Sequence, residues 1–157
     1  MKIVEILKLE EIKIDFTGTT KDSVLNEMID SFIGDSRVLD IEKVRTVVLE
    51  REKIMSTGVG NGFAIPHGKT NMVSEMVAGF GVLKNPIEFE ALDGNPVNLI
   101  FLLIGQEDAV GQHIKMLSRI SRIMNQENIR TKLANANSGE EILQIFDEQD
   151  SKYLELS

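Results

Sequence analysis

The segment with the richest potential for chemistry runs from Gly58 to Lys69 and reads GVGNGFAIPHGK. Three glycines within five positions predict a flexible loop that could close over a small ligand. The apolar run that follows reads as a short buried strand, and it ends at Pro66 because proline has no amide hydrogen. His67 is thus delivered at a strand end, with Gly68 leaving one side of its imidazole open. Such an imidazole can act as a nucleophile, a base or a metal ligand.

His67 also has a purely structural interpretation. A histidine beside a Pro-Gly turn often serves as a turn residue whose ring bonds a nearby carbonyl. The glycine density of the preceding loop favours the functional interpretation, and two further candidate residues can be placed independently.

Arg51 is the second candidate and ends a helix predicted over residues 41–51. At about 100° per residue, it falls in the apolar stripe that contains Val44 and Val48, so we expect it to point toward the protein or over the edge of its core. It lies just before the glycine loop and could reach the space above His67. The alternative is a cation that snorkels at a helix end and complements the helix dipole.

His113 is the third candidate. It lies in the first two turns of a helix predicted over residues 108–124, after an apolar strand predicted over residues 97–104. Its helical neighbours Val110 and Leu117 place it at the border of the buried face. Ligand sites in α/β sheets gather at the carboxyl ends of strands, and His113 follows such an end. The alternative is a packing histidine with satisfied hydrogen bonds.

Apolar periodicity predicts the elements that must position these side chains. The expected strands cover residues 12–16, 63–65, 77–83, 87–89 and 97–104. The expected helices cover residues 19–33, 41–51, 108–124, 128–134 and 139–146, and residues 151–157 read as a solvated tail. Strands and helices interleave without a repeat or linker. The sequence therefore predicts a single α/β domain over residues 1–157, a sandwich with a mixed central sheet between helical layers.

Three other patterns are interpreted as structural. The glycine spacing does not match a dinucleotide fingerprint and no Walker-type motif occurs, so no nucleotide phosphate cradle is expected. Asp108 is interpreted as a helix cap, and the charged run from Glu50 to Lys53 as a solvated helix end.

Composition limits the chemistry further. The chain has 157 residues, no cysteine and two histidines. The lack of cysteine excludes thiolate catalysis and a cysteine-ligated metal site, and two histidines argue against a histidine-rich one. A formal net charge of -8 disfavours nucleic-acid binding and suits a partner with a basic face. The first 14 residues lack the apolar core of a signal peptide, and the longest apolar run is too short to span a bilayer. We therefore expect a cytoplasmic protein.

A family resemblance begins at Arg51. The stretch REKIMSTGVGNGFAIPHGK over residues 51–69 is similar to the signature of the IIA component of the bacterial phosphoenolpyruvate-dependent sugar phosphotransferase system (PTS). The similarity is to the fructose–mannitol class, which includes the nitrogen-regulatory IIA proteins. The stretch PIEFEALDGNPVNL over residues 86–99 and the helix of His113 also look familial. Phe63 departs from the pattern, because a smaller aliphatic is more usual there.

The resemblance implies the role of each candidate residue. His67 would accept a phosphoryl group through Nε2, while Arg51 and His113 would help to bind that group. The donor would be the histidine phosphocarrier protein, and the acceptor a IIB component or a regulatory target protein. Together with the composition, this leaves no cofactor, metal or nucleic acid expected, and contact with a membrane is expected only through a partner.

Two functional hypotheses remain open at the sequence level. One is a phosphoryl carrier for sugar uptake of the fructose or mannitol type, and the other is a nitrogen-regulatory module whose phosphorylation state decides which protein it holds. Both require His67 and differ in the acceptor. A structural domain without chemistry is the third interpretation, and it predicts that replacing His67 changes stability alone.

Overall fold

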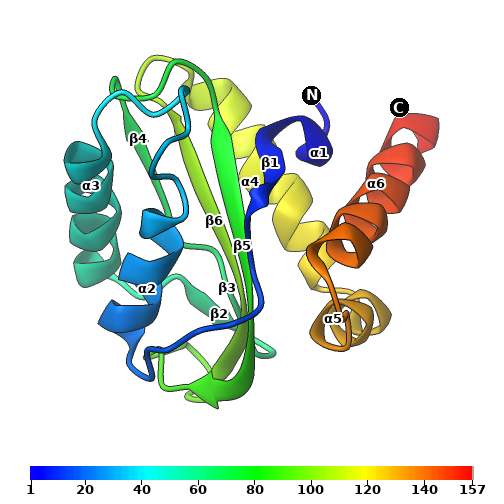
Figure 1. Cartoon of the computed structure of the whole chain (residues 1–157). Helices are drawn as coiled ribbons and strands as arrows, with labels where there is room; N and C mark the ends of the chain where they lie inside the picture. The colour runs from blue at the N-terminus through cyan, green and yellow to red at the C-terminus, as the bar shows by residue number, and fades with distance from the viewer. Residues whose placement is uncertain (157) are drawn as a thin grey trace.

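A mixed sheet of six strands forms the centre of the computed structural model, which describes residues 1–156 (Figure 1). The strands are β1 (Leu7–Lys13), β2 (Gly58–Gly60), β3 (Phe63–Ala64), β4 (His67–Thr70), β5 (Val77–Ile87) and β6 (Val97–Gln106). Their order is β1-β5-β6-β3-β2, and β4 also pairs with β6. β5 and β6 are antiparallel, whereas β1 is parallel to β5, and β3 and β4 are parallel to β6.

Helices cover both faces of this sheet (Figure 1). They are α1 (Ile3–Ile6), α2 (Lys21–Asp30), α3 (Ile41–Ile54), α4 (Val110–Met124), α5 (Glu127–Ala134) and α6 (Gly139–Leu156). α2 and α3 lie on one face, and the other four helices lie on the opposite face. The predicted mixed sheet between helical layers is therefore confirmed. Among the described residues, no helix is both long and apolar enough to cross a membrane.

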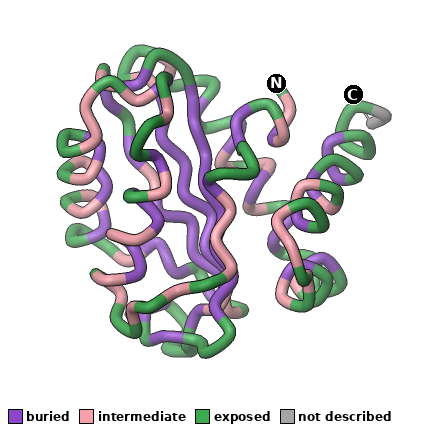
Figure 2. The backbone as a smooth tube through the Cα atoms, viewed as in Figure 1, coloured by how far each residue is buried: buried purple, intermediate pink, exposed green. Residues whose placement is uncertain are grey.

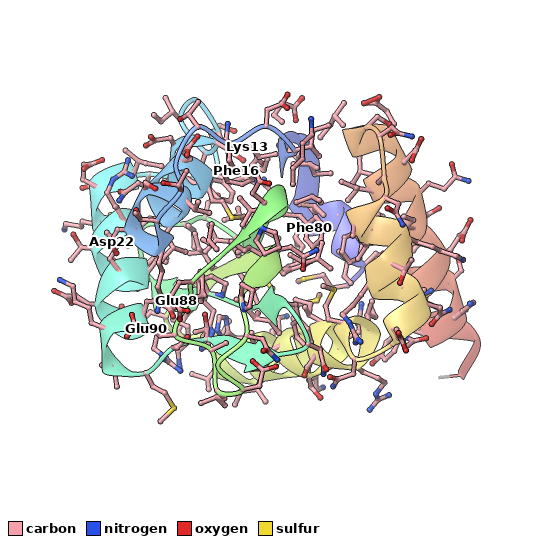
Figure 3. The ribbon with its side chains drawn as sticks, turned by 90° about the horizontal axis from the view of Figure 1, so that it is seen from below. Lys13, Phe16, Asp22, Phe80, Glu88 and Glu90 are labelled. Atoms are coloured by element: carbon pink, nitrogen blue, oxygen red, sulfur yellow. The ribbon has the colours of Figure 1, made fainter. Side chains whose placement is uncertain are left out.

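β6 contributes to the cores on both faces of the sheet. Its odd-numbered residues from Leu99 to Leu103 pack with α4, α5 and α6, and its even-numbered residues from Ile100 to Ile104 pack with α2 and α3. Phe80, Phe101 and Phe146 meet edge to face in the first of these cores (Phe80 is labelled in Figure 3). Figure 2 shows the sheet strands as the most buried part of the chain. A strand buried on both faces must be apolar throughout, which explains the unbroken apolar run in the sequence.

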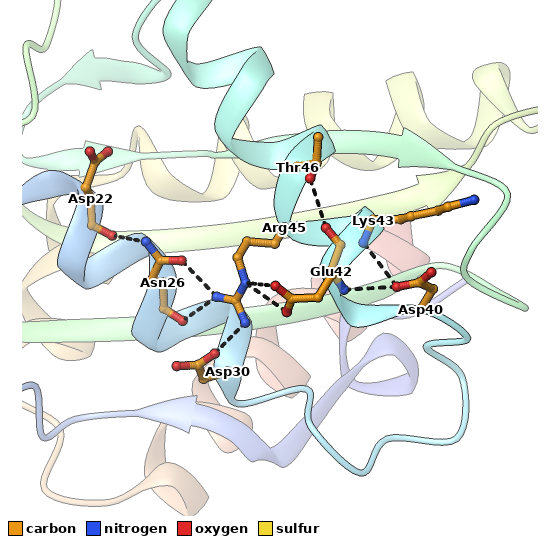
Figure 4. A network of polar contacts seen from close by, with 8 residues as sticks. All are labelled: Asp22, Asn26, Asp30, Asp40, Glu42, Lys43, Arg45 and Thr46. Carbon is orange, nitrogen blue, oxygen red and sulfur yellow. Dashed lines mark hydrogen bonds and ion pairs between the residues drawn. The ribbon is translucent and has the colours of Figure 1, made fainter.

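Arg45 ties α2 to α3 on the side away from the sheet (Figure 4). Its guanidinium donates to Asn26 Oδ1 at 2.8 Å and to Asp30 Oδ1 at 2.6 Å on α2, and to Glu42 on its own helix. Asp40 caps the start of α3 by accepting two amides of the first turn. These contacts make the two helices one layer, and that layer fixes where the end of α3 lies over the sheet.

The two chain ends differ from the predicted pattern. β1 covers Leu7–Lys13 instead of residues 12–16, and α1 was not predicted. Asp150, only 1% exposed, accepts the amides of Ile3 and Val4 at 3.0 and 3.2 Å and so holds the start of α1. A contact between residues so far apart in sequence leaves no trace in local periodicity.

Contacts with distant parts of the chain also hold the C-terminal helix. α6 continues to Leu156, so the predicted tail is wrong up to residue 156, and residue 157 lies outside the described residues. The guanidinium of Arg119 lies 3.9 Å from the ring centroid of Tyr153, which anchors the last turns of α6 against α4.

Helix ends also differ from the predicted ones. Thr20 caps α2 together with Ser23, one residue after the predicted start, and α2 ends at Asp30. The predicted cap at Asp108 is wrong: α4 begins at Val110, and its N-cap residue Ala109 makes no side-chain cap bond. β5 extends to Ile87 and absorbs the start of the short strand predicted over residues 87–89.

Candidate functional site

The glycine-rich segment forms a β-hairpin instead of a flexible loop. β2 pairs antiparallel with β3, and the turn between them places Asn61 and Gly62 at φ angles of 57° and 81°. β3 starts opposite Leu99 of β6, whereas His67 lies opposite Leu103. At about 3.3 Å per residue, four residues along a strand separate the hairpin from His67 by about 13 Å. The prediction of a flexible loop is therefore wrong, because the segment is a paired hairpin placed along β6 from His67.

His67 is the first residue of β4. Pro66 interrupts the edge between β3 and β4, and both of these strands run parallel to β6. The Pro66 carbonyl still accepts the Leu103 amide at 3.0 Å, so the interruption stays aligned with the sheet. The predicted strand end before His67 is confirmed, and the chain re-enters the sheet at His67 itself. Its imidazole is half-buried there.

Gly68 permits close packing of α3 on β4. A Cβ atom at this position would lie 2.6 Å from Cγ1 of Val47, which no side chain could accommodate without a shift. Arg51 lies one helical turn beyond Val47, on the same side of α3. The glycine thus lets α3 pack against β4, and this packing determines where Arg51 lies relative to β4.

One hydrogen bond fixes the tautomer of His67. Nδ1 lies 2.8 Å from the carbonyl oxygen of Ile65. Because a carbonyl can only accept, Nδ1 carries the hydrogen and Nε2 keeps its lone pair. Burial lowers the pKa of His67 below its ordinary value; the bond to Ile65 opposes this effect, and the positive charge of Arg51 adds to it. The ring is therefore neutral at pH 7, with Nε2 as its basic nitrogen.

His113 lies beside His67. The two ring centroids are 5.7 Å apart, with planes inclined at 51°. Its residue is 3% exposed, and neither ring nitrogen has a hydrogen-bond partner within residues 1–156. Burial, followed by the charges of His67 and Lys69, lowers the pKa of His113 to about 4. Gly105 makes room for this ring, since a Cβ atom there would lie 2.5 Å from Nδ1.

Arg51 lies near His67 but not on the buried stripe of α3. Its side chain is half-buried, and one guanidinium nitrogen donates to the Met55 carbonyl at 2.9 Å. The expectation that Arg51 points into the protein is only partly met. Its charge still acts on the His67 imidazole, where it lowers the pKa of the ring, whereas the ring contact joins His67 to His113.

Glu52 is the buried charge of α3, and the prediction of a solvated helix end is wrong for this residue. Glu52 is 6% exposed and accepts the Thr57 amide at 2.8 Å and the Thr57 hydroxyl at 2.6 Å. The signal was present in the sequence, because Val44, Val48 and Glu52 follow one another at the four-residue spacing of a single helix face.

The arrangement provides one basic nitrogen and one neutral imidazole side by side, with a cation whose charge acts on the first ring. Two buried ring nitrogens without a partner in residues 1–156 are rare, and they leave His113 able to donate to a bound group. Within the part of the chain that the structure describes, no cluster of histidine and carboxylate side chains could hold a metal ion. A small tetrahedral anion with several oxygens, such as a phosphoryl group, suits these groups, because the imidazole and guanidinium can both donate to its oxygens.

Comparison with known proteins agrees with this chemistry. Residues 5–149 match the family described as "Phosphoenolpyruvate-dependent sugar phosphotransferase system, EIIA 2". The PTS system fructose-specific EIIABC component of Bacillus subtilis is 35% identical over 150 residues, which cover 96% of this chain and 24% of that protein. The chain thus spans about a quarter of that relative's length.

Two further proteins match along nearly their whole length. The PTS system fructose-specific EIIA component of Haloferax volcanii is 32% identical over 146 residues, covering 93% of this chain and 95% of that protein. The crystal structure of nitrogen regulatory protein IIA-Ntr from Neisseria meningitidis superposes with a TM-score of 0.84 and 36% identity, covering 90% of this chain and 97% of that one.

Proposed function

The chain belongs to the EIIA 2 family of the phosphoenolpyruvate-dependent sugar phosphotransferase system, and from this premise we propose that it is a phosphoryl carrier that holds the group on His67. One observation carries the proposal. The bond from His67 Nδ1 to the Ile65 carbonyl leaves Nε2 as a neutral nitrogen with a free lone pair. A histidine nucleophile needs this state, in which one nitrogen is fixed and the other is unprotonated.

The proposed transfer is a single in-line displacement at phosphorus. The Nε2 lone pair attacks the phosphoryl group of the phosphorylated histidine phosphocarrier protein, and a new N–P bond forms as the donor's N–P bond breaks. The donor imidazole leaves with its electron pair, and the hydrogen on His67 Nδ1 stays in place. Such a transfer asks mainly for positioning and for neutralisation of the phosphoryl oxygens.

Arg51 and His113 supply that neutralisation in our proposal. The Arg51 guanidinium offers a charged fork of donors, and its present bond to the Met55 carbonyl leaves other N–H groups to bind oxygen. His113 offers one N–H, since its buried nitrogens lack partners within residues 1–156. None of these three groups is a carboxylate, so none of them is a strong base for activating water. Such an arrangement protects the labile N–P bond.

For the onward step we propose transfer to a IIB component that serves sugar uptake of the fructose or mannitol type. This assignment is supported by two relatives named as fructose-specific, one of which matches along nearly its whole length. The second candidate function is regulatory: the phosphorylation state of His67 would decide which target protein the chain holds. It is supported by the 36% identity and 0.84 TM-score to a nitrogen regulatory protein.

The test is intact-mass analysis after incubation with phosphoenolpyruvate, the purified first enzyme of the system and the histidine phosphocarrier protein. We expect one acid-labile phosphoryl adduct on the wild type and none on His67→Ala. The other histidine provides the matched control, and His113→Ala should still carry an adduct. An adduct on His67→Ala, or none on the wild type with active general components, would overturn the proposal.

The acceptor separates the two candidate functions. The labelled protein is mixed with purified IIB domains of the fructose and mannitol types, and loss of label is followed against time. Rapid transfer that depends on His67 supports the uptake function. Retention of the label, together with binding to a regulatory target that changes on phosphorylation, supports the regulatory one.

A further inference from the structure

We infer that Glu52 is a positioning residue for His67, acting through Thr57 and the backbone of Ile65. The inference rests on the proposed function only for its catalytic consequence. The physical coupling itself can be measured on the unphosphorylated protein.

The first link is a pair of hydrogen bonds that Thr57 donates to Glu52. One carboxylate oxygen accepts the Thr57 amide at 2.8 Å, and the other accepts the Thr57 hydroxyl at 2.6 Å. Both residues are almost fully buried, at 6% and 5% exposure. A buried carboxylate that binds one residue at two points fixes both the position and the direction of that residue's peptide group.

The second link runs from Thr57 to the imidazole. The Thr57 carbonyl accepts the Ile65 amide at 3.1 Å, and the Ile65 carbonyl lies 2.8 Å from Nδ1 of His67. Pro66 follows Ile65 and has no amide with which to hold this turn. The contact with Thr57 therefore restrains the peptide that orients His67 in a segment where the sheet is interrupted.

The third link is the cation that balances Glu52. Lys21 Nζ at the start of α2 lies 2.9 Å from Glu52 Oε2 and 4.6 Å from the ring centroid of Phe89. The Lys21 side chain is only 15% exposed. A carboxylate taken out of water needs such a partner, and Lys21 supplies it from the start of α2. The chain of contacts thus reaches from α2 through α3 to β4.

This chain has an electronic as well as a geometric consequence. The negative charge of Glu52 favours the protonated form of the His67 ring and partly offsets the effect of burial on the pKa of His67. Hydrogen bonds in series polarise one another, so a carbonyl aligned by Thr57 is a better acceptor for the Nδ1 hydrogen. The aligned carbonyl is the effect that selects the Nδ1–H tautomer and so leaves Nε2 free, whereas the charge of Glu52 raises the basicity of the ring.

The test uses 15N NMR of the two His67 ring nitrogens as a function of pH. The variants are Glu52→Gln and Thr57→Val, and Thr57→Ser should restore the hydroxyl contact. Glu50→Gln is the matched control, because it removes the same charge from an exposed position on the same helix. Thermal unfolding of each variant is recorded alongside.

We expect the wild type, Glu50→Gln and Thr57→Ser to show the Nδ1–H tautomer alone. In Glu52→Gln and Thr57→Val, a measurable fraction of the Nε2–H tautomer should appear, and Glu52→Gln should also lower the pKa of His67. Phosphoryl transfer to His67 should fall by about tenfold to a hundredfold in these two variants, as expected for a misplaced nucleophile.

A purely structural role for Glu52 would lower the melting temperature and leave the tautomer unchanged. That result in both variants overturns the inference. If Glu52→Gln does not fold, Thr57→Val decides the question, because it keeps the shape of the side chain and the charge of Glu52. A tautomer shift in a protein whose wild type accepts no phosphoryl group would leave the coupling intact and remove the proposed function.

Discussion

Among the strands that pair on one side only, β1 and β4 each carry a cluster of titratable side chains. On β1, Glu11 meets Arg37 and Asp35 from the connection between α2 and α3. On β4, His67 meets His113 from α4. The two clusters are similarly buried, yet they satisfy their polar atoms very differently.

The β1 cluster is closed upon itself. The Arg37 guanidinium donates to Glu11 Oε1 at 2.9 Å, to both oxygens of Asp35 at distances from 2.6 to 3.2 Å, and to the Ile6 carbonyl at 3.1 Å. Burial, followed by the charge of Asp35, raises the pKa of Glu11 to about 7, while hydrogen bonds from Arg37 lower the pKa of Asp35 to about 2. Each side chain has its partner within the protein.

The β4 cluster is open. His113 has two buried nitrogens without a partner in residues 1–156, and His67 uses one nitrogen and leaves the other free. A closed polar network stabilises and specifies a fold, whereas an open one lowers stability unless something else binds there. We infer from this difference that the β1 cluster serves the architecture, whereas the β4 cluster fits the phosphoryl-binding role proposed for it. Perturbing each cluster in the same way should therefore give opposite results.

The largest effect is expected at the closed cluster. Arg37→Met removes the cation that pairs with both Glu11 and Asp35, so the free energy of unfolding at pH 7 should fall by about 3–5 kcal/mol. Urea denaturation measures this change. Arg45→Met is the control, because Arg45 pairs with Asp30 and Glu42, whose side chains are 50% and 71% exposed; its loss should cost about 1 kcal/mol or less. Equal losses in the two variants would contradict the assignment of a structural role to the β1 cluster.

The next effect is on the pH dependence of stability. The native pKa of Glu11, about 7, exceeds its unfolded value of 4.5, so its contribution to stability falls as pH rises from 4.5 to 7. The native pKa of His113, about 4, lies below its unfolded value of 6.5, so its contribution falls as pH drops from 6.5 to 4. Between pH 4.5 and 6.5 the two contributions oppose each other.

Replacing Glu11 should expose the effect of His113 on the pH dependence of stability, and replacing His113 should expose the effect of Glu11. In Glu11→Gln, stability should rise with pH across this window, and in His113→Leu it should fall, by at most about 1.4 kcal/mol per pH unit in each case. Urea denaturation at pH 4.5, 5.5 and 6.5 measures both slopes, and the wild type should lie between them. Variants that keep the slope of the wild type would show that these groups are not the buried titrating residues of the two clusters.

The features that the sequence could predict are those that depend on local patterns, and the features that it could not predict depend on contacts between distant residues. The central strand β6, the helices α3 to α5 and the position of His67 follow from local patterns of apolar residues, proline and glycine. Burial of Glu52 also follows from a local pattern, its four-residue spacing from Val48, but a run of charges concealed it. Local patterns could not predict α1, because its stability depends on Asp150 near the other end of the chain.

For the Gly58–Gly62 segment, the sequence predicted a flexible loop where the structure has a β-hairpin. Its composition is typical of a mobile loop, but pairing with β3, which itself pairs with β6, makes it a hairpin. The contact between His67 and His113 depends on the sheet register and on the space that Gly105 leaves. Neither the pairing nor the register is encoded in residues adjacent in sequence, so both needed the fold.

The smallest expected effect, a change in stability on replacing His113, separates the β1 and β4 clusters most directly. At pH 7 the buried imidazole of His113 is neutral and unpartnered, so His113→Leu should raise the free energy of unfolding by about 1 kcal/mol, because it removes polar atoms that burial leaves unsatisfied. His113→Ala is the matched control and should lower stability instead, since it leaves a cavity where the ring was. Glu11→Met makes the corresponding change at β1, and it should destabilise because it leaves Arg37 with one charge partner fewer. A gain at His113 with a loss at Glu11 would mean that the protein keeps a destabilising histidine beside His67 for what it binds. A loss at both positions would mean that His113 has a structural partner, and the β4 cluster would then be as closed as the one on β1.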